Sequence, residues 1–317
     1  MNSPIDSFAM TWSNEVAAAR GRDRPLVALE STLITHGLPW PTNLETARSA
    51  EKEVRAAGAV PATIAVLEGS VCLGLEESEL EQLARHGNRL VKASRRDLGP
   101  TLAKQRTAGT TVSSTLFLAR RAGLRIAATG GIGGVHRGAG ETFDISTDLD
   151  ELARADGMLL VCSGAKSILD LPATLEAIET RGITVVGYRT SHFPAFTVQS
   201  SALSIDWRVE SPTEAAGLLV KHHQLGCPGA VLLVQEVTAD LAIDRQEMED
   251  AVNQALNAAE KAGLSGKAIT PFLLNHVRET TEGRSLIANR ALIEANAKLA
   301  AQVAVAMHHL SAQDRLA

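Results

Sequence analysis

Short apolar runs alternate with longer amphipathic stretches along most of this chain, and that alternation limits the folds open to it. The apolar runs predict buried strands, and the stretches between them carry apolar residues at helical spacing. Such alternation is typical of a mainly parallel sheet with helices on both faces. The predicted strands are 25–30, 61–67, 89–93, 125–129, 157–162, 184–187 and 230–234, and the predicted helices are 43–57, 76–86, 109–122, 149–155, 168–181, 212–225, 245–262 and 270–309 with a break at Gly283.

The predicted architecture is an α/β fold, with a mainly parallel sheet in an α/β/α layered domain and a helical C-terminal section. The strand number also fits a closed barrel, but the uneven spacing and the long helical ends favour an open layered sheet. Residues 1–23 are polar and rich in alanine, so we expect a flexible N-terminal segment with a short helix near 14–20. Residues 24–317 are expected to form a single domain, because no linker rich in Pro, Gly or Ser divides them. Asn43 is the expected N-cap of the first long helix.

Composition excludes several kinds of partner. The 317 residues carry a formal net charge of −5 without a basic block, and only 3% of them are aromatic. These values argue against a nucleic-acid or membrane-surface partner. No apolar run reaches membrane-spanning length and no signal peptide is visible, so we expect a soluble cytoplasmic protein. The widely separated Cys72, Cys162 and Cys227 predict buried, reduced thiols, with neither a disulfide framework nor a zinc site.

A glycine-rich loop follows the predicted strand 125–129. Six glycines occur within the eleven residues from 130 to 140, and His136, Arg137, Asp144 and Asp148 lie in or just after them. Free N–H groups in such a loop form an anion-binding concavity, which His136 and Arg137 would complement. Asp144 and Asp148 are oxygen ligands suited to a hard cation. The alternative is a flexible surface loop followed by a helix that Asp148 caps, but the concentration of chemical groups favours a site.

Two residues at predicted strand ends are candidates for catalysis. Glu30 ends the apolar strand 25–30, where a carboxylate is either functional or caps backbone N–H groups at the rim of the sheet. Lys166 lies where strand 157–162 gives way to a predicted helix, whose N-terminal dipole favours a neutral, nucleophilic amine. The same position also suits a lysine that binds phosphate. Lys92, near the end of strand 89–93, is the rival nucleophile.

The chemical groups together favour an enzyme that acts on a phosphorylated sugar or its derivative. Glu30 is the candidate acid or base and Lys166 the candidate nucleophile, with cationic groups around the glycine-rich loop. The charged run 94–97 is either a solvated face or a second positive group beside the phosphate. The residues by themselves do not name the substrate.

Longer motifs occur in a fixed order from about Pro25 to Asn296. They are the stretches 27–32 with His36-Gly37, 60–65, 92–97, 109–112, the glycine-rich loop through Ser146, 162–170, 194–196, 270–274, and Ser285-Leu286 with Asn289. In these motifs the chain resembles the pseudouridine-5'-phosphate glycosidases, the family that includes the indigoidine synthase A-like proteins.

The resemblance implies a reversible cleavage of the C–C glycosidic bond of pseudouridine 5'-phosphate by water, giving uracil and ribose 5-phosphate. It implies that Glu30 is the proton donor and that Lys166 is the covalent nucleophile, which forms an imine with the opened ribose. It further implies that Asp144 holds one manganese ion per subunit, largely through water, and that the assembly is a homotrimer. The substrate-binding residues expected on this basis are Lys92, Val112, Thr129, His136, Arg137, Ser146, Thr147, Asp148 and Asn289.

Two stretches depart from the family pattern. Gln235-Glu236-Val237-Thr238 replaces a run that usually reads Asn-Pro-Ile-Pro, and Glu294-Ala295-Asn296 replaces a more usual pair of asparagines. We expect these changes to affect one edge of the pocket. Neither departure touches Glu30, Asp144 or Lys166.

Two other functions remain as alternatives. One is a different sugar-phosphate lyase or a kinase-like enzyme, although the chain has no Walker-type Gly-x-x-x-x-Gly-Lys-Ser/Thr run. The other is a non-catalytic nucleotide-binding relative, which the presence of every candidate catalytic group disfavours.

Overall fold

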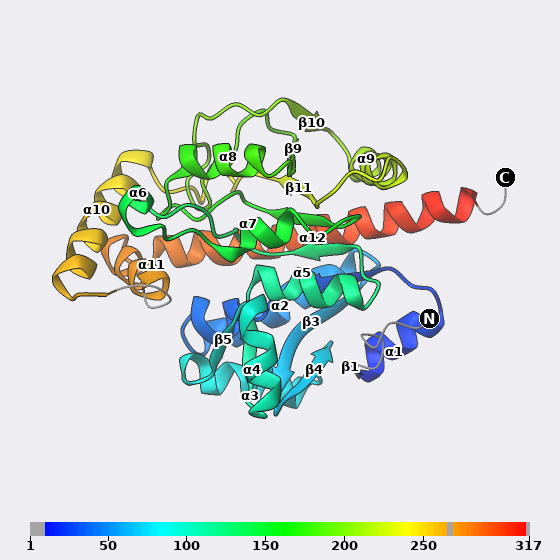
Figure 1. Ribbon diagram of the computed structural model, residues 1–317. Helices are drawn as coiled ribbons and strands as arrows, with labels where there is room; N and C mark the ends of the chain where they lie inside the picture. The colour runs from blue at the N-terminus through cyan, green and yellow to red at the C-terminus, as the bar shows by residue number, and fades with distance from the viewer. Residues whose placement is uncertain (1–9, 265–268, 315–317) are drawn as a thin grey trace.

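The computed structural model describes residues 10–264 and 269–314. Its strands and helices alternate as predicted (Figure 1). The strands are β1 (Met10–Trp12), β2 (Leu26–Leu29), β3 (Val60–Leu67), β4 (Ser70–Leu73), β5 (Val91–Ala93), β6 (Ala108–Thr110), β7 (Ile126–Ala128), β8 (Leu159–Cys162), β9 (Thr184–Tyr188), β10 (Trp207–Val209) and β11 (Val231–Val234). The helices are α1 (Asn14–Gly21), α2 (Thr42–Ala56), α3 (Glu77–His86), α4 (Leu98–Ala103), α5 (Val112–Arg121), α6 (Ala139–Thr142), α7 (Thr147–Leu152), α8 (Leu171–Thr180), α9 (Pro212–Gln224), α10 (Arg245–Lys261), α11 (Ile269–Thr280) and α12 (Arg284–Asp314).

One sheet runs through the molecule in the order β1-β4-β3-β2-β7-β8-β11-β9-β10. All neighbours from β3 to β10 along this order are parallel. The long strand β3 pairs with β2 through its first half, and through its second half it pairs antiparallel with β4 and β6. The predicted mainly parallel α/β fold is therefore confirmed, and the described sheet ends at β10 without closing into a barrel.

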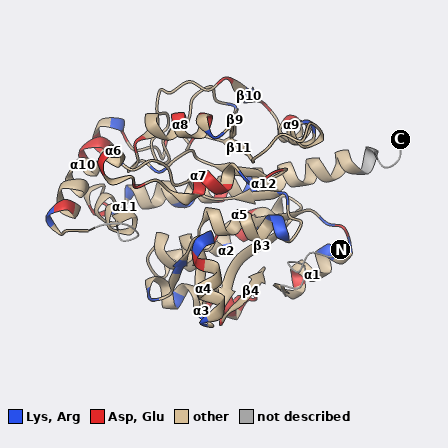
Figure 2. Cartoon of the chain, viewed as in Figure 1, with Lys and Arg blue, Asp and Glu red and all other residues tan. Residues whose placement is uncertain are grey.

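Helices cover both faces of the sheet because successive strand residues point to opposite sides. Leu159 packs in one apolar cluster with α2, α9 and α12, whereas Leu160 packs in a second cluster with α5, α7 and α8. The long α12 extends across the molecule (Figure 1). Basic and acidic residues are interspersed along the ribbon (Figure 2). Cys72 and Cys162 are buried, as predicted, whereas Cys227 is only half-buried, and all three are free thiols.

Several local predictions were wrong. Residues 108–110 form β6, so the helix predicted from 109 begins at Val112. The helix predicted from 168 begins only at Leu171, where Asp170 accepts a hydrogen bond from the N–H of Ala173. Asn43 does not cap α2, because its buried amide donates to the carbonyls of Ile34 and Ala84. The short strands β1, β4, β6 and β10 were not predicted, whereas the equally short β5 and β7 were, because each lies within a longer apolar run, 89–93 and 125–129.

The N-terminal segment is more ordered than the prediction of a flexible 1–23 allowed. Residues 1–9 lie outside the described residues. From Met10 on, β1 pairs in parallel with β4, and α1 buries Val16 and Ala19. Backbone pairing and the burial of these two side chains offset the entropy cost of ordering the segment.

Candidate active site

The candidate site lies where the carboxyl ends of β2, β7 and β8 meet. Glu30 follows β2, the glycine-rich loop follows β7, and Lys166 follows β8. In the sheet, β3 lies on one side of β2 and β7 lies on the other, so the strand order reverses at β2. Open α/β sheets place their ligands at such a reversal of strand order, because the loops on either side leave a crevice there.

A cavity of about 300 Å³, the inner cavity, occupies this crevice. Every residue predicted for the site lines it except Thr129 and Arg137. The predicted residues in its wall are Glu30, Lys92, Val112, His136, Asp144, Ser146, Thr147, Asp148, Lys166 and Asn289.

Glu30 is buried, with 8% of its surface exposed, and two threonine hydroxyls hold its carboxylate. Thr32 Oγ1 donates to Oε2 at 2.7 Å, and Thr129 Oγ1 donates to Oε1. Thr129 therefore holds the Glu30 carboxylate by a hydrogen bond and does not itself line the inner cavity. The donors to this carboxylate are hydroxyls, not the backbone N–H groups that a rim-capping role required. The two threonines fix the direction of the carboxyl group, which is what a proton donor needs.

Lys166 is half-buried in the loop between β8 and α8. Its backbone N–H donates to Ile132 O at 3.2 Å, and Ala165 pairs with Ile132. The loop after β8 is thereby attached to the glycine-rich loop. Because α8 begins five residues later, the predicted helix-dipole effect on Lys166 does not apply.

Two histidines beside the lysines are shifted toward their neutral forms. Burial, together with the charge of Lys92, lowers the pKa of His36 to about 4. Burial also lowers the pKa of His136, against the opposing effect of Asp144 and with the support of Lys166 and Lys92. Both rings are neutral near pH 7 and serve as hydrogen-bonding groups. These effects show that Asp144, Lys166 and Lys92 all lie close enough to His136 to influence its charge.

The glycines of the loop are required for close approach to its neighbours. A Cβ on Gly131 would lie 2.6 Å from the ring of Phe196, and a Cβ on Gly133 would overlap Ser146 Oγ. Ser146 caps α7 by accepting from the N–H of Asp148, so the alternative in which Asp148 caps that helix is wrong.

Asp148 instead ties two elements together. Its Oδ1 accepts from the N–H of Ser113 at 3.0 Å, and its Oδ2 accepts from the N–H of Gly133 at 2.9 Å. The carboxylate thus joins the first turn of α5 to the glycine-rich loop. Val112 opens α5, where backbone N–H groups lack acceptors within the helix.

Arg137 does not line the inner cavity. Its guanidinium donates through two nitrogens to the Glu249 carboxylate on α10, at 2.8 and 3.0 Å. It anchors the loop beside His136 to a helix on the outside of the site. Its predicted contact with substrate has no support in this arrangement.

Asp144 is the carboxylate best placed to hold a metal ion. No group of three His, Cys, Asp or Glu side chains in the described part of the chain is arranged as a metal site. Asp144 is half-buried in the wall of the inner cavity, whereas both oxygens of Asp148 already accept backbone hydrogen bonds. A single carboxylate with water and phosphate oxygens suits a hard divalent cation, so the residues present fit the predicted manganese ion.

The inner cavity also has walls that sequence reasoning missed. Arg96, Phe196, Pro271, Leu274 and Ile293 line it in addition to the predicted residues. Arg96 lies in the charged run whose role was left open, so that run contributes to the site. Phe196, Pro271 and Leu274 lie in the family motifs 194–196 and 270–274, which are the signal that could have identified them, whereas Ile293 lies in no motif.

The departures from the family pattern lie behind the site. Gln235 Nε2 donates to Asn296 Oδ1 at 2.7 Å. The buried Asn296 amide donates in turn to the carbonyls of Thr129 and Gly130. Neither Gln235 nor Asn296 lines the inner cavity, and these two departures reach the pocket through Gly130, which does line it. These two side chains support the start of the glycine-rich loop.

None of the helices in the described part of the chain combines the length and the apolar character that a membrane crossing requires.

Comparisons with known proteins agree on one family. The family model described as "Indigoidine synthase A like protein" matches residues 15–306. A pseudouridine-5'-phosphate glycosidase of Caldanaerobacter subterraneus subsp. tengcongensis is 49% identical over 94% of this chain and 96% of its own length. One from Sorangium cellulosum is 50% identical over 96% of each chain.

Two solved structures share the fold. The prealnumycin C-glycosynthase AlnA, solved in complex with ribulose 5-phosphate, superposes with a TM-score of 0.87 at 38% identity, over 96% of this chain and 98% of that one. An indigoidine synthase A-like protein of Thermotoga maritima superposes with a TM-score of 0.86 at 35% identity, over 94% and 96% of the two chains.

Proposed function

This chain belongs to the indigoidine synthase A-like family, and on that premise we propose that it is an enzyme that reversibly hydrolyses pseudouridine 5'-phosphate to uracil and ribose 5-phosphate. Relatives close to 50% identical over nearly their whole length are named pseudouridine-5'-phosphate glycosidases. The observation that carries the proposal is the placement of Glu30 and Lys166 in the wall of one cavity, beside the glycine-rich loop.

The C–C bond determines which groups the reaction needs. The scissile bond joins the ribose to a carbon atom of the base. There is therefore no leaving oxygen to protonate, as there is in ordinary glycosidases. In our proposal the amine of Lys166 attacks the anomeric carbon C1' of the ribose as the ring opens. When the C–C bond breaks, its electrons pass to uracil C5 and C1' becomes an imine carbon. Water then hydrolyses the imine, which releases ribose 5-phosphate and restores the amine.

Glu30 supplies the proton that uracil C5 accepts as the bond breaks. The hydroxyls of Thr32 and Thr129 hold its carboxyl group in one orientation. The proton can therefore be delivered in one direction only. In the synthetic direction the same carboxylate removes that proton.

The phosphate end of the substrate would lie against Lys92, Arg96 and the start of α5, with Ser146 and Thr147 nearby. These groups combine positive charge with backbone and hydroxyl donors, which suit a phosphate. Binding energy gained at the phosphate orients C1' toward Lys166. Asp144 would hold one manganese ion, which supplies electrostatic organisation of phosphate and water. Asn289 would contact the base.

The proposal also covers the oligomeric state, the metal content and the cellular compartment. We infer a homotrimer with one manganese ion per subunit, acting in the cytoplasm on a small-molecule substrate. The three free cysteines suit a reducing compartment.

The test follows uracil release from pseudouridine 5'-phosphate by chromatography, using protein stripped of metal, with and without added manganese. We expect release only with manganese. Glu30→Gln should release none, and Asp144→Asn should release none at manganese concentrations that saturate the wild type. A folded wild-type protein that releases no uracil in either condition would overturn the proposed substrate. Release without metal would remove the metal from the proposal.

A further inference from the structure

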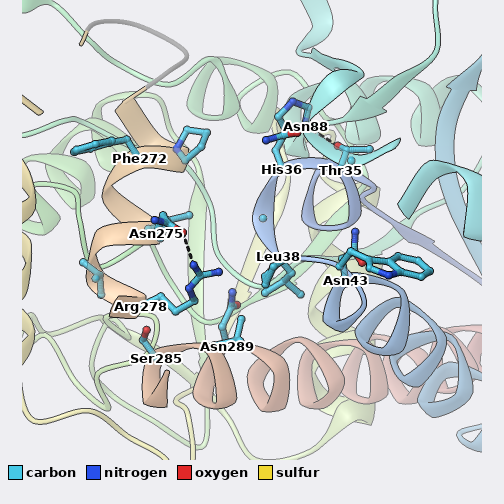
Figure 3. Close-up of a pocket in the computed structure, with 18 of the residues that line it drawn as sticks. Thr35, His36, Leu38, Asn43, Asn88, Phe272, Asn275, Arg278, Ser285 and Asn289 are labelled. Carbon is cyan, nitrogen blue, oxygen red and sulfur yellow. Dashed lines mark hydrogen bonds between the residues drawn. The ribbon is translucent and has the colours of Figure 1, made fainter. Parts of the chain in front are cut away.

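The groups that the proposed function assigns to the phosphate lie in one part of the inner cavity. A second cavity of about 590 Å³, the outer cavity, adjoins the inner one, and Figure 3 shows Phe272 of α11 on one side of it and His36 on the other. His36 lines both cavities, whereas Lys92, Arg96 and Val112 line only the inner one. The phosphate groups therefore belong to the part of the inner cavity that the outer cavity does not share, where packed elements form the wall.

Two consecutive arginines of the charged run 94–97 have different surroundings in that wall. Arg96 lines the inner cavity. Arg95 does not line it, and its Nη1 donates to Glu151 Oε2 on α7 at 2.7 Å. The Arg95 guanidinium also lies over the ring of Phe117 on α5, with 4.8 Å between Cζ and the ring centroid. Arg95 is therefore attached to two helices, while its neighbour in the chain faces the cavity.

Further hydrogen bonds join the same three segments. The N–H of Arg95 donates to Ser113 Oγ at 3.3 Å, and Ser113 Oγ lies 3.4 Å from Thr147 Oγ1. Asp148 Oδ1 accepts from the N–H of Ser113. The charged run, the first turn of α5 and the first turn of α7 thus form one network. Each of these three segments also contributes residues to the lining of the inner cavity.

Glu151 is a buried carboxylate whose contribution to folding does not explain its presence. Its side chain is 1% exposed, and Oε1 has no hydrogen-bond partner among the described residues. Burial of a carboxylate costs free energy, and one ion pair with the partly exposed Arg95 offsets only part of it. Apolar side chains of similar size in such positions often leave a protein at least as stable. The Arg95–Glu151 pair therefore indicates a role in the site.

We propose that the Arg95–Glu151 pair positions the phosphate-binding wall of the inner cavity. The pair holds the charged run against α7, so that Arg96 meets the phosphate of the sugar in one fixed arrangement. Arg95 and Glu151 are positioning residues, since they act on the phosphate through Arg96 and do not touch it. The inference rests on the proposed function, because the phosphate is that of ribose 5-phosphate.

A purely electrostatic role for Arg95 predicts a different result. If its charge attracted the phosphate from a distance, removal of the negative charge of Glu151 would strengthen phosphate binding. If the pair positions the charged run, removal of Glu151 weakens phosphate binding although the wall becomes more positive. The direction of the change in a variant at position 151 therefore separates the two roles.

The experiment measures the imine at Lys166 by borohydride trapping and protein mass, with manganese present. Wild type and variants are treated with ribose 5-phosphate over a range of concentrations, and in parallel with an excess of ribose, which lacks the phosphate. Glu151→Leu replaces the carboxylate by an apolar side chain of similar size, and Arg95→Gln removes the other partner.

Each of these two variants should need on the order of tenfold more ribose 5-phosphate for half-maximal trapping. Trapping at saturating ribose 5-phosphate, and trapping with ribose, should equal those of wild type, because Lys166 keeps its place. Glu151→Gln keeps an acceptor for Arg95 and should lie between wild type and Glu151→Leu.

Asp150→Asn is the matched control. Asp150 precedes Glu151 on α7 and accepts from Arg181 Nε at 2.9 Å, so its ion pair joins α7 to the residue after α8 and not to the charged run. The substitution removes one carboxylate and one ion pair from the same helix, outside the lining of the inner cavity. Half-maximal trapping should stay within about twofold of the wild-type concentration.

Three results would overturn the positioning role. Tighter binding of ribose 5-phosphate by Glu151→Leu shows that the charges act on the phosphate directly. Trapping that falls equally with ribose 5-phosphate and with ribose shows that the pair only supports the fold. Half-maximal concentrations that match wild type in both variants show that the pair does not affect the phosphate. Wild-type protein that is not trapped by ribose 5-phosphate overturns the proposed function itself, so the two inferences fail in different ways.

Discussion

Asp144 and Asp148 are residues of the same type whose carboxylates have different surroundings. They lie four residues apart, and both were candidates for a cation. Asp148 is buried, with each oxygen accepting a backbone N–H, so its charge is already used to join α5 to the glycine-rich loop. Asp144 is half-buried in the cavity wall, where its charge acts on His136. Of the two, only Asp144 remains a candidate ligand for the proposed metal ion.

Lys166 carries the first prediction at the scale of the residue. Without its amine no imine forms, so Lys166→Ala should lower turnover on the order of a thousandfold or more. Borohydride reduces an imine to a stable amine. Wild-type protein treated with ribose 5-phosphate and borohydride should therefore gain the mass of the reduced sugar phosphate, and Lys166→Ala should not.

Lys92, the rival nucleophile, provides the control for that experiment. Lys92→Ala should bind ribose 5-phosphate more weakly and still be trapped at saturating sugar phosphate. Trapping that survives in Lys166→Ala and disappears in Lys92→Ala would exchange the two roles.

His36 carries a prediction about pH. In the folded protein, burial and Lys92 hold the pKa of His36 near 4, against an ordinary value of 6.5. Between these values the unfolded chain binds a proton that the folded chain does not, so the free energy of unfolding falls as the pH drops from about 6.5 to about 4. His36→Gln should therefore lose less stability than wild type between pH 7 and pH 5, as measured by urea midpoints.

His86→Gln, an exposed change at the end of α3, is the comparison for that measurement. A loss of stability between pH 7 and pH 5 that is equal in wild type and His36→Gln would show that His36 does not carry the effect.

At the scale of the element, the site depends on how loops and helices are attached to one another. The glycine-rich loop is held by α5 through Asp148 and by the loop after β8 through Ile132. It is also held by α10 through the pair of Arg137 and Glu249. Helix α10 packs against α11, which lines both cavities. The Arg137–Glu249 pair thus connects two walls of the site.

This pair carries a prediction at that scale. The side chains are 26% and 46% exposed, so solvent screens the interaction, and we expect a coupling energy of about 1 kcal/mol. A double-mutant cycle with Arg137→Ala, Glu249→Ala and the combined variant measures it by urea unfolding. Both single variants should also raise KM with a smaller effect on kcat, because they loosen a wall without removing a reacting group. Additive effects on stability and an unchanged KM would show that the pair is only a surface contact.

At the scale of the whole molecule, the sheet brings together groups that are far apart in the chain. Glu30, Lys166 and Asn289 come from the first, middle and last thirds of the sequence and line one cavity. Large apolar side chains remain exposed in the described chain, among them Trp207 at 65% and Leu225 at 80%. The proposed homotrimer offers a partner surface for such residues.

The corresponding prediction concerns mass in solution. Light scattering on the purified protein should give three times the chain mass of 33.5 kDa. The value should stay constant over a tenfold dilution, because a closed ring with extensive interfaces dissociates only at low concentration. A mass of one or two chains would reject the trimer.

The sequence by itself determined the alternation of β and α elements, the mainly parallel sheet, and the two residues at strand ends that meet in the cavity. Each depends on local information: apolar periodicity sets the element, and parallel strands bring their carboxyl ends to one edge. The ends of most predicted elements fell within a few residues of the observed ones for the same reason. The family motifs added the expected substrate, the choice of manganese and the imine chemistry expected of Lys166, of which the geometry of the site alone specifies none.

Only the tertiary structure decided which side chains face the cavity and which are used elsewhere. Arg137, predicted to bind substrate, lies outside the lining of the inner cavity and pairs with Glu249, more than a hundred residues later in the chain. Thr129 supports Glu30, and Asn296 supports the glycine-rich loop from α12. The outer cavity exists because α11 packs opposite residues 36–40. Such contacts depend on how distant elements pack, and no local periodicity or motif spacing encodes that packing.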